Sequence, residues 1–160
     1  MLKITNIHKT FNAGTINEKK ALNGLNLELK EGDFVTVIGG NGAGKSTMLN
    51  AIAGTWFVDD GAISIDGVNV TWLSEHKRAQ YLGRVFQDPM TGTAATMQIE
   101  ENLALAARRG HSRGLRKGIT QKEREEYKER LKILELGLED RLTTKVGLLS
   151  GGQRQALTLL

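Results

Sequence analysis

The stretch of sequence that decides the fold is GGNGAGKS, residues 39–46. Gly39 and Gly44 flank four residues and are followed by Lys45 and Ser46, which is the spacing of a phosphate-binding loop. Glycines let successive backbone N–H groups point toward one polyphosphate, and the positive end of the following helix attracts the same anion. A glycine-rich turn that fits this spacing by accident is the alternative, and the flanking sequence decides between the two.

The sequence on both sides of the loop favours phosphate binding. Phe34–Ile38 is a short run rich in β-branched residues, typical of a central strand covered on both faces. Residues 45–53 have apolar side chains spaced for one face of a helix, and Gly54 ends that helix. The sequence therefore predicts a strand, a loop and a helix in this order. The residues predicted to bind nucleotide are Gly39, Gly40, Asn41, Gly42, Ala43, Gly44, Lys45, Ser46 and Thr47.

Two side chains at the end of the loop suit the chemistry of a nucleotide. Lys45 supplies a mobile positive charge for the outer phosphates. The hydroxyl of Ser46 is a ligand for Mg²⁺, an ion that keeps most of its bound water. The loop therefore predicts a magnesium–nucleotide complex as its ligand.

Other segments of the first half read as strands, a hairpin and a short helix. Leu22–Leu29 alternates apolar and polar residues, as a half-buried strand does. Gly61–Val70 has alternating runs around Asp66-Gly67, which predicts a hairpin. Ser74 is expected to cap a short helix that runs through Tyr81. Val85-Phe86 is expected to be a strand that ends at Gln87.

The second half of the chain is predicted to be helical. Ile99, Leu103 and Ala107 lie four residues apart, which places them on one side of a helix. Thr120–Glu123 has the spacing of a capping box for a second helix, which is expected to end at Gly137. Ser150 is expected to cap a last helix, in which the chain ends.

Composition limits the classes of function. The chain has 160 residues, 39% of them hydrophobic, no cysteine, no apolar stretch long enough to cross a membrane and no signal peptide, so a cytoplasmic domain is expected. The net charge is +4, and part of this excess lies between Arg108 and Lys117. Nucleic acid or anionic lipid could bind there. No aromatic residues interleave for base stacking, so a solvated loop is favoured and no nucleic-acid partner is expected.

A second glycine-containing stretch, Leu149-Ser150-Gly151-Gly152-Gln153, identifies a family together with the first. The chain resembles the nucleotide-binding domains of ABC ATPases, whose signature motif reads like this stretch, and the resemblance covers all 160 residues. It implies an α/β fold: a P-loop NTPase core, here incomplete, with an antiparallel β subdomain and an inserted α-helical subdomain. The implied division is 1–87 for the core with its β portion, 88–150 for the helical subdomain and 151–160 for the helix returning to the core.

The resemblance also assigns residues outside the phosphate-binding loop. Phe11 matches the aromatic residue on which the family stacks adenine, and Gln87 matches the glutamine that reaches Mg²⁺ and contacts the membrane subunits. In this family two subunits pair head to tail, so that the signature motif of one closes on the ATP held by the other. The implied residues for this contact in trans are Ser150, Gly151, Gly152 and Gln153. ATP and Mg²⁺ are the implied cofactors, with Ser46 and Gln87 as metal ligands.

The catalytic residues of the family have no counterpart here. Family members continue into an apolar strand that ends in the Walker B aspartate, next to a catalytic glutamate, and carry a histidine further on. Glu135, Glu139 and Asp140 lie in the helical region, so none of them takes the acidic roles. The chain's histidines, His8, His76 and His111, all precede the signature motif. The expectation is a chain that ends before Walker B, contains no catalytic residue, and binds but does not hydrolyse ATP.

The functional prediction is the ATP-binding component of an ABC transporter, an ATPase of the uptake type, with amino acids, including aromatic ones, as the suggested substrates. Its expected partners are a second ATP-binding subunit and integral membrane permease subunits. Its expected location is the cytoplasm, peripheral on the inner face of the membrane. Two alternatives remain open: a soluble ABC ATPase acting in DNA repair or translation, and a nucleotide-binding module that never hydrolyses.

Overall fold

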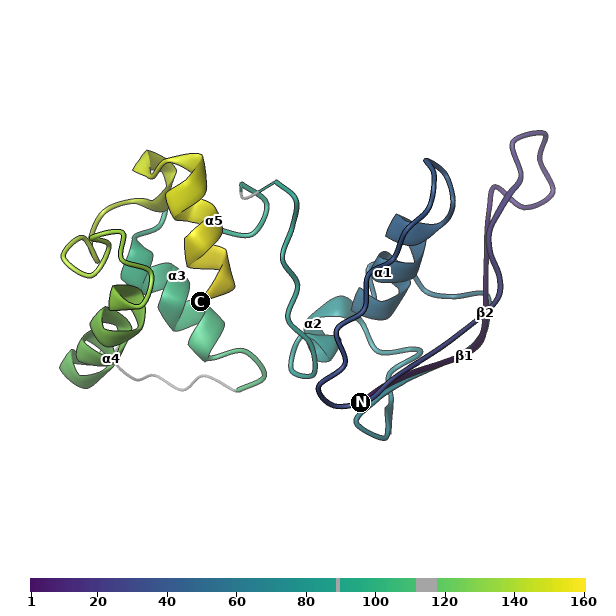
Figure 1. Cartoon of the computed structure of the whole chain (residues 1–160), viewed down its shortest axis with the longest axis horizontal. Helices are drawn as coiled ribbons and strands as arrows, with labels where there is room; N and C mark the ends of the chain where they lie inside the picture. Colours follow the sequence, from purple (N-terminus) through teal and green to yellow (C-terminus); the bar gives the residue numbers. More distant parts are fainter. Residues whose placement is uncertain (89, 112–117) are drawn as a thin grey trace. The chain divides into compact units, whose positions relative to one another are not determined.

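The chain forms two compact units. The computed structural model describes residues 1–88, 90–111 and 118–160, shown in Figure 1. The first unit is Met1–Gly83 and the second is Arg84–Leu160. Most of the predicted solvated loop between Arg108 and Lys117 lies outside the described residues.

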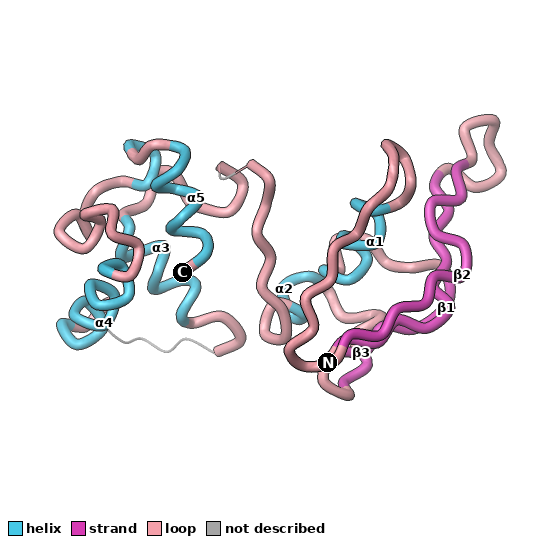
Figure 2. The backbone as a smooth tube through the Cα atoms, in the orientation of Figure 1, coloured by secondary structure: helices cyan, strands magenta, loops and turns pink. Residues whose placement is uncertain are grey.

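A four-stranded antiparallel sheet forms one layer of the first unit. Its strands are β1 (Leu2–Phe11), β2 (Lys19–Leu29), β3 (Asp60–Ile65) and β4 (Val68–Asn69), in the order β2-β1-β3-β4. Figure 2 shows β1 and β2 running beside each other, in magenta. The predicted strand over Leu22–Leu29 and the predicted hairpin are confirmed as β2 and as β3–β4.

Strand β1 is an element that the sequence did not reveal. It pairs with β2 on one side and β3 on the other, so it is central to the sheet. Its core residues are Ile4 and Ile7, which are 2% and 0% exposed, and the register shifts between them. Asn6 has a φ of 48° at this irregularity. Because the bulge puts two buried residues three positions apart, the period of two that marks a strand is lost.

Helix α1 (Lys45–Ala53) packs against the sheet and confirms the predicted helix after the loop. Met48 and Ala51 of this helix join apolar side chains of the strands in one core. The buried members of this core are Ile4, Ile7, Leu22, Met48, Ala51, Val58, Ile63, Ile65 and Val70. The phosphate-binding loop is therefore attached to a helix that is fixed by burial of its apolar face.

Two predicted strands are not formed. Phe34–Ile38 has no strand structure, and Phe34 and Ile38 are 95% and 90% exposed. Val85-Phe86 is also outside any strand, and α2 (Glu75–Arg78) ends before the predicted limit at Tyr81. A strand needs a neighbour for its N–H and C=O groups. Among the described residues no segment pairs with either apolar run, so these predictions were wrong for the chain as it stands.

The second unit is helical. Its elements are α3 (Ile99–Ala107), α4 (Gln121–Lys132), the 3₁₀ turn η1 (Val146–Leu148) and α5 (Gly151–Leu159). They enclose a core of their own, made of Ile99, Leu103, Ala104, Tyr127, Leu131, Leu138, Leu142, Val146, Leu149 and Leu157. The three predicted helices are confirmed, although α4 itself ends five residues before Gly137.

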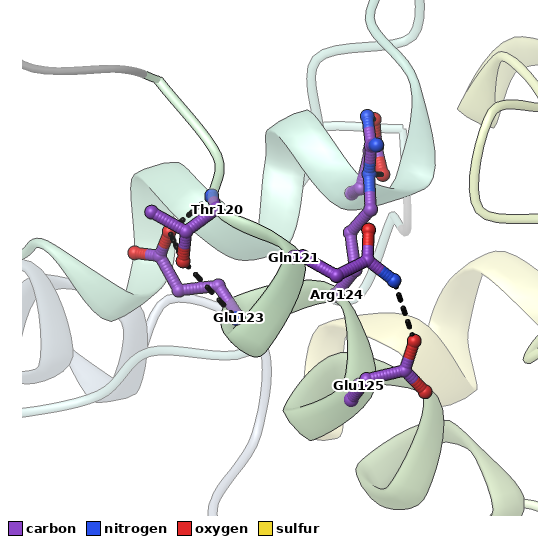
Figure 3. Close-up of polar contacts among 6 residues, drawn as sticks. Thr120, Gln121, Glu123, Arg124 and Glu125 are labelled. Carbon is purple, nitrogen blue, oxygen red and sulfur yellow. Dashed lines mark hydrogen bonds and ion pairs between the residues drawn. The ribbon is translucent and has the colours of Figure 1, made fainter.

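Polar contacts fix the start of α4 and join it to α3 (Figure 3). The hydroxyl of Thr120 accepts from the N–H of Glu123, and the Glu123 carboxylate accepts from the N–H of Thr120, which is the predicted capping box. Arg124 donates two hydrogen bonds, of 2.7 and 2.8 Å, to Glu100 in the first turn of α3. The Glu100 side chain is only 5% exposed, so this bidentate pair compensates a buried charge.

Candidate functional site

The phosphate-binding loop is closely packed against strand β2. Gly44 is the N-cap of α1 and has a φ of 85°, a region that favours glycine. A Cβ atom on Gly44 would lie 2.5 Å from the carbonyl oxygen of Ala21. Gly42 also has a positive φ, of 83°. The glycines at 42 and 44 are therefore required by backbone geometry, and at Gly44 also by the close approach of a neighbouring strand.

The charges at the loop suit an anion. The ammonium of Lys45 donates hydrogen bonds of 2.6 and 2.8 Å to the carbonyl oxygens of Gly39 and Gly40, so it lies over the loop. The first turn of α1 contains no acidic residue, and the positive end of the helix dipole is therefore not neutralised. Ser46 is exposed in the same turn. A polyphosphate placed here would meet backbone N–H groups, one ammonium and one hydroxyl.

Phe11 lies at the end of β1, in the same unit as the phosphate-binding loop. It pairs in the sheet with Lys19, whose ammonium lies 3.5 Å from the position of a Cβ on Gly42. The ring of Phe11 meets the indole of Trp56 edge to face, with centroids 4.9 Å apart and an interplanar angle of 77°. Phe11 and the loop thus belong to one unit, and Lys19, which pairs with Phe11 in the sheet, reaches the loop at Gly42.

Asp59 forms hydrogen bonds to residues at the same end of β1. Its carboxylate accepts a hydrogen bond of 2.7 Å from the ammonium of Lys9 and one of 2.6 Å from the N–H of Thr10. The hydrogen bond from Lys9, followed by the one from Thr10, holds the pKa of Asp59 below its usual value, against the opposing effect of burial. This carboxylate therefore stays ionised and keeps the strand end in place.

The Ser150–Gln153 stretch forms the start of α5 in the second unit. Ser150 is the N-cap, its hydroxyl accepts from the N–H of Gln153, and the Gln153 side chain accepts from the N–H of Ser150. This confirms Ser150 as the cap. Gly151 and Gly152 are exposed, and a Cβ on either would meet no atom within 4 Å. The helix start is therefore open to approach from outside.

Arg154 holds the turn that leads into this helix start. It is 4% exposed and donates to the carbonyl oxygens of Val146 and Gly147 at 3.1 Å. A Cβ on Gly147 would lie 2.9 Å from the carbonyl oxygen of Ala95, and the N–H of Gly147 donates to that oxygen. The turn that precedes the Ser150–Gln153 stretch is thus held by the Arg154 side chain and by a backbone contact with Ala95.

Gln87, which the family resemblance assigns to Mg²⁺ binding, is exposed and lies in the second unit. Ser46, the other assigned ligand, lies in the first unit. Their roles as magnesium ligands stay predictions. Across residues 1–88, 90–111 and 118–160, no three His, Asp or Glu side chains gather as a metal site. No helix in the described part of the chain has the length and hydropathy to cross a membrane.

Sequence reasoning missed a buried arginine that supports α1 from its far end. Arg78 is 0% exposed and donates to the carbonyl oxygens of Ala51 and Ile52 in the last turn of α1, and to those of Thr71 and Leu73. Burial lowers the pKa of its guanidinium. A lone arginine in a polar stretch carries no sequence signal for such a contact. The same is true of Trp56 and Lys19, whose partners are distant in the sequence.

Comparison with known proteins gives consistent results. Residues 22–160 match the ABC transporter family. Over its whole length the chain is 40% identical to the tyrosine transport ATP-binding protein of Clostridioides difficile (strain R20291), and it covers 63% of that protein. It is 32% identical to the bacitracin export ATP-binding protein BceA of Halalkalibacterium halodurans, with 97% of the chain and 58% of the relative aligned. The chain thus spans about three fifths of the length of these relatives.

Solved structures agree with the family match. The ATP-binding cassette MJ0796, in a dimeric post-hydrolysis state bound to ADP and Pi, is 33% identical, has a TM-score of 0.79 and aligns with 99% of this chain and 67% of its own. The ATP-binding cassette MJ1267 in its ADP conformation has a TM-score of 0.73 at 30% identity, with 99% and 62% aligned. This likeness confirms the predicted P-loop NTPase fold, and the chain belongs to the ABC transporter family.

Proposed function

We propose that the protein is the ATP-binding component of an ABC transporter, a family whose members couple binding and hydrolysis of ATP to transport across a membrane. The observation that carries this proposal is the phosphate-binding loop at the start of α1, closed against β2 at Gly44 and carrying Lys45. The family match and the ADP- and Pi-bound cassette with the same fold support it.

The nucleotide-binding residues are proposed to act in three groups. Residues 39–47 hold the phosphates, Ser46 and Gln87 are ligands of Mg²⁺, and Phe11 stacks on the base. The start of α5, Ser150–Gln153, contacts the ATP of a second ATP-binding subunit. Its exposed glycines and uncovered helix N-terminus suit an anion that approaches from outside.

The proposed partners are a second ATP-binding subunit and membrane permease subunits, with the protein peripheral on the cytoplasmic face of the membrane. The related cassette MJ0796 is dimeric, and the macrolide export protein MacB of Vibrio parahaemolyticus, 32% identical, is an ATP-binding/permease protein. For the substrate we propose an amino acid taken up by the cell, since one relative is a tyrosine transport protein.

Nucleotide binding without turnover is the expected behaviour of this 160-residue chain. The loop supplies the groups that hold a triphosphate, whereas no acidic residue of the sequence stands where the family places its catalytic glutamate. Calorimetry with MgATP should give a saturable heat, and a phosphate-release assay on the same sample should give no signal above a protein-free blank. A turnover rate comparable to that of an intact ATP-binding cassette would contradict the prediction that this chain contains no catalytic residue. Absence of ATP binding would contradict the whole proposal.

The contact with membrane subunits is testable at Gln87. Because the chain has no cysteine, a single cysteine placed at Gln87 reacts at one site only. In membranes that contain the complete transporter, Gln87→Cys is expected to crosslink to a permease subunit through a short bifunctional reagent. Lys30→Cys is a matched control, exposed in the other unit, and is expected to remain uncrosslinked. Failure of Gln87→Cys to crosslink to any membrane subunit would contradict the transporter assignment.

A further inference from the structure

The rings of Phe11 and Trp56 pack on each other outside the core of their unit. Neither ring belongs to the buried cluster of apolar residues around Ile7 and Ile63, and Trp56 remains 37% exposed. An edge-to-face pair stabilises both rings beyond the area that it buries. The contact of 4.9 Å therefore restricts the orientation of a ring that lies at the surface.

A second contact from the same segment reaches the same ring. The ammonium of Lys9 lies 5.7 Å from the centroid of Phe11, within the range of a cation–π interaction. Lys9 is held there by Asp59, which lies three residues after Trp56. The short segment 56–59 thus contacts the end of β1 both through an indole and through a carboxylate.

This segment is continuous with the helix that begins at the phosphate-binding loop. The N–H groups of Gly54, Thr55 and Trp56 all donate to the carbonyl oxygen of Asn50 in α1. A helix of nine residues is about 13 Å long and stiff. Trp56 is therefore connected rigidly to Lys45 at the other end of the same helix.

We propose that Trp56 is a positioning residue for nucleotide binding, whose indole fixes the ring of Phe11 in the orientation in which the base stacks on it. This inference rests on the proposed function, in particular on base stacking by Phe11. A ring that is already ordered loses less conformational entropy when a base binds. Trp56 therefore contributes to the affinity for the base and not to the affinity for the phosphates, which meet the loop.

The test measures separately how the base and the phosphates contribute to binding. Dissociation constants of MgATP and of inorganic triphosphate are measured by calorimetry on the 160-residue chain. Trp56→Leu is expected to weaken ATP binding by about three- to tenfold, the range for loss of an aromatic pair, and to leave triphosphate binding unchanged. Trp56→Phe retains a ring and is expected to restore most of the lost affinity. In a Phe11→Ala background, Trp56→Leu is expected to cause no further loss, because the two residues act through one ring.

The chain offers a matched control and clear contrary outcomes. Trp72 forms a second aromatic pair, with Phe57 at 6.0 Å between ring centroids, and Trp72→Leu is expected to change neither constant. If Trp56→Leu loses equal affinity for ATP and for triphosphate, the role of Trp56 is purely structural and the inference is overturned. If Trp56→Leu loses no affinity for ATP, the inference is overturned as well. If Phe11→Ala leaves ATP affinity unchanged while triphosphate still binds, stacking and this inference fail but the phosphate-binding loop stands. If the wild type binds neither ligand, the proposed function fails as well.

Discussion

Replacing Arg78 with methionine is expected to lower the free energy of unfolding of the first unit by about 3–5 kcal/mol. Arg78 donates to four carbonyl oxygens from its buried position, two of them at the end of α1. Methionine is unbranched and apolar, so it fills much of the space but donates nothing. Each buried acceptor left without a partner costs about 1–3 kcal/mol, and some of them regain water.

The measurement is urea denaturation followed by tryptophan emission. Both tryptophans of the chain lie in Met1–Gly83, so their emission reports on this unit. Lys77→Met removes a neighbouring charge that is exposed, and it is expected to change the free energy by less than about 0.5 kcal/mol. Arg78→Lys keeps the charge but reaches fewer acceptors, so an intermediate loss is expected. A loss below about 1 kcal/mol in Arg78→Met would show that water replaces the guanidinium.

Replacing Lys45 with alanine is expected to weaken ATP binding by about 10- to 100-fold, which corresponds to about 1.5–3 kcal/mol for hydrogen bonds to a charged group. Without nucleotide, the ammonium is held by the carbonyl oxygens of Gly39 and Gly40. These are neutral acceptors on an exposed loop, and a phosphate oxygen is a stronger partner. The substitution therefore removes a contact that matters more in the complex than in the free protein.

The control for Lys45→Ala removes one positive charge elsewhere. Lys30 is exposed at the end of β2, and its side chain has no ion-pair partner in the described part of the chain. Lys30→Ala is expected to change ATP affinity less than about twofold at physiological salt, because its charge is screened. Calorimetry with MgATP measures both variants, and urea denaturation checks that both are folded. Equal affinity in wild type and Lys45→Ala would contradict the phosphate-binding loop.

Local signals in the sequence were sufficient for the caps at Thr120 and Ser150 and for the loop. The capping boxes at Thr120 and Ser150 depend on side chains and backbone groups within three residues of each other. The loop between Gly39 and Ser46 depends on the positive φ angles that glycine allows. Such features form with little help from the rest of the molecule, and each lies where the sequence predicts it.

Features that depend on distant partners were missed or wrong. Phe34–Ile38 has the composition of a strand, but composition supplies no hydrogen-bonding neighbour, and the segment remains exposed. Strand β1 was hidden by its bulge at Asn6, and its pairing with β3 joins residues more than 50 positions apart. The contacts of Arg78 and Trp56 likewise join segments that are far apart in the sequence. A pattern within one short stretch of residues cannot reveal such contacts.

The contact between Arg78 and Gly54 restricts how this protein can change over time. A Cβ on Gly54 would lie 2.7 Å from the Nε atom of Arg78, and the φ of 85° at Gly54 already disfavours any side chain there. A substitution at 54 would therefore displace the guanidinium, and a smaller residue at 78 would free the space without repairing the backbone. A single substitution at either position is therefore expected to destabilise the unit. In a library of random variants, this pair should be among the positions that tolerate the fewest replacements.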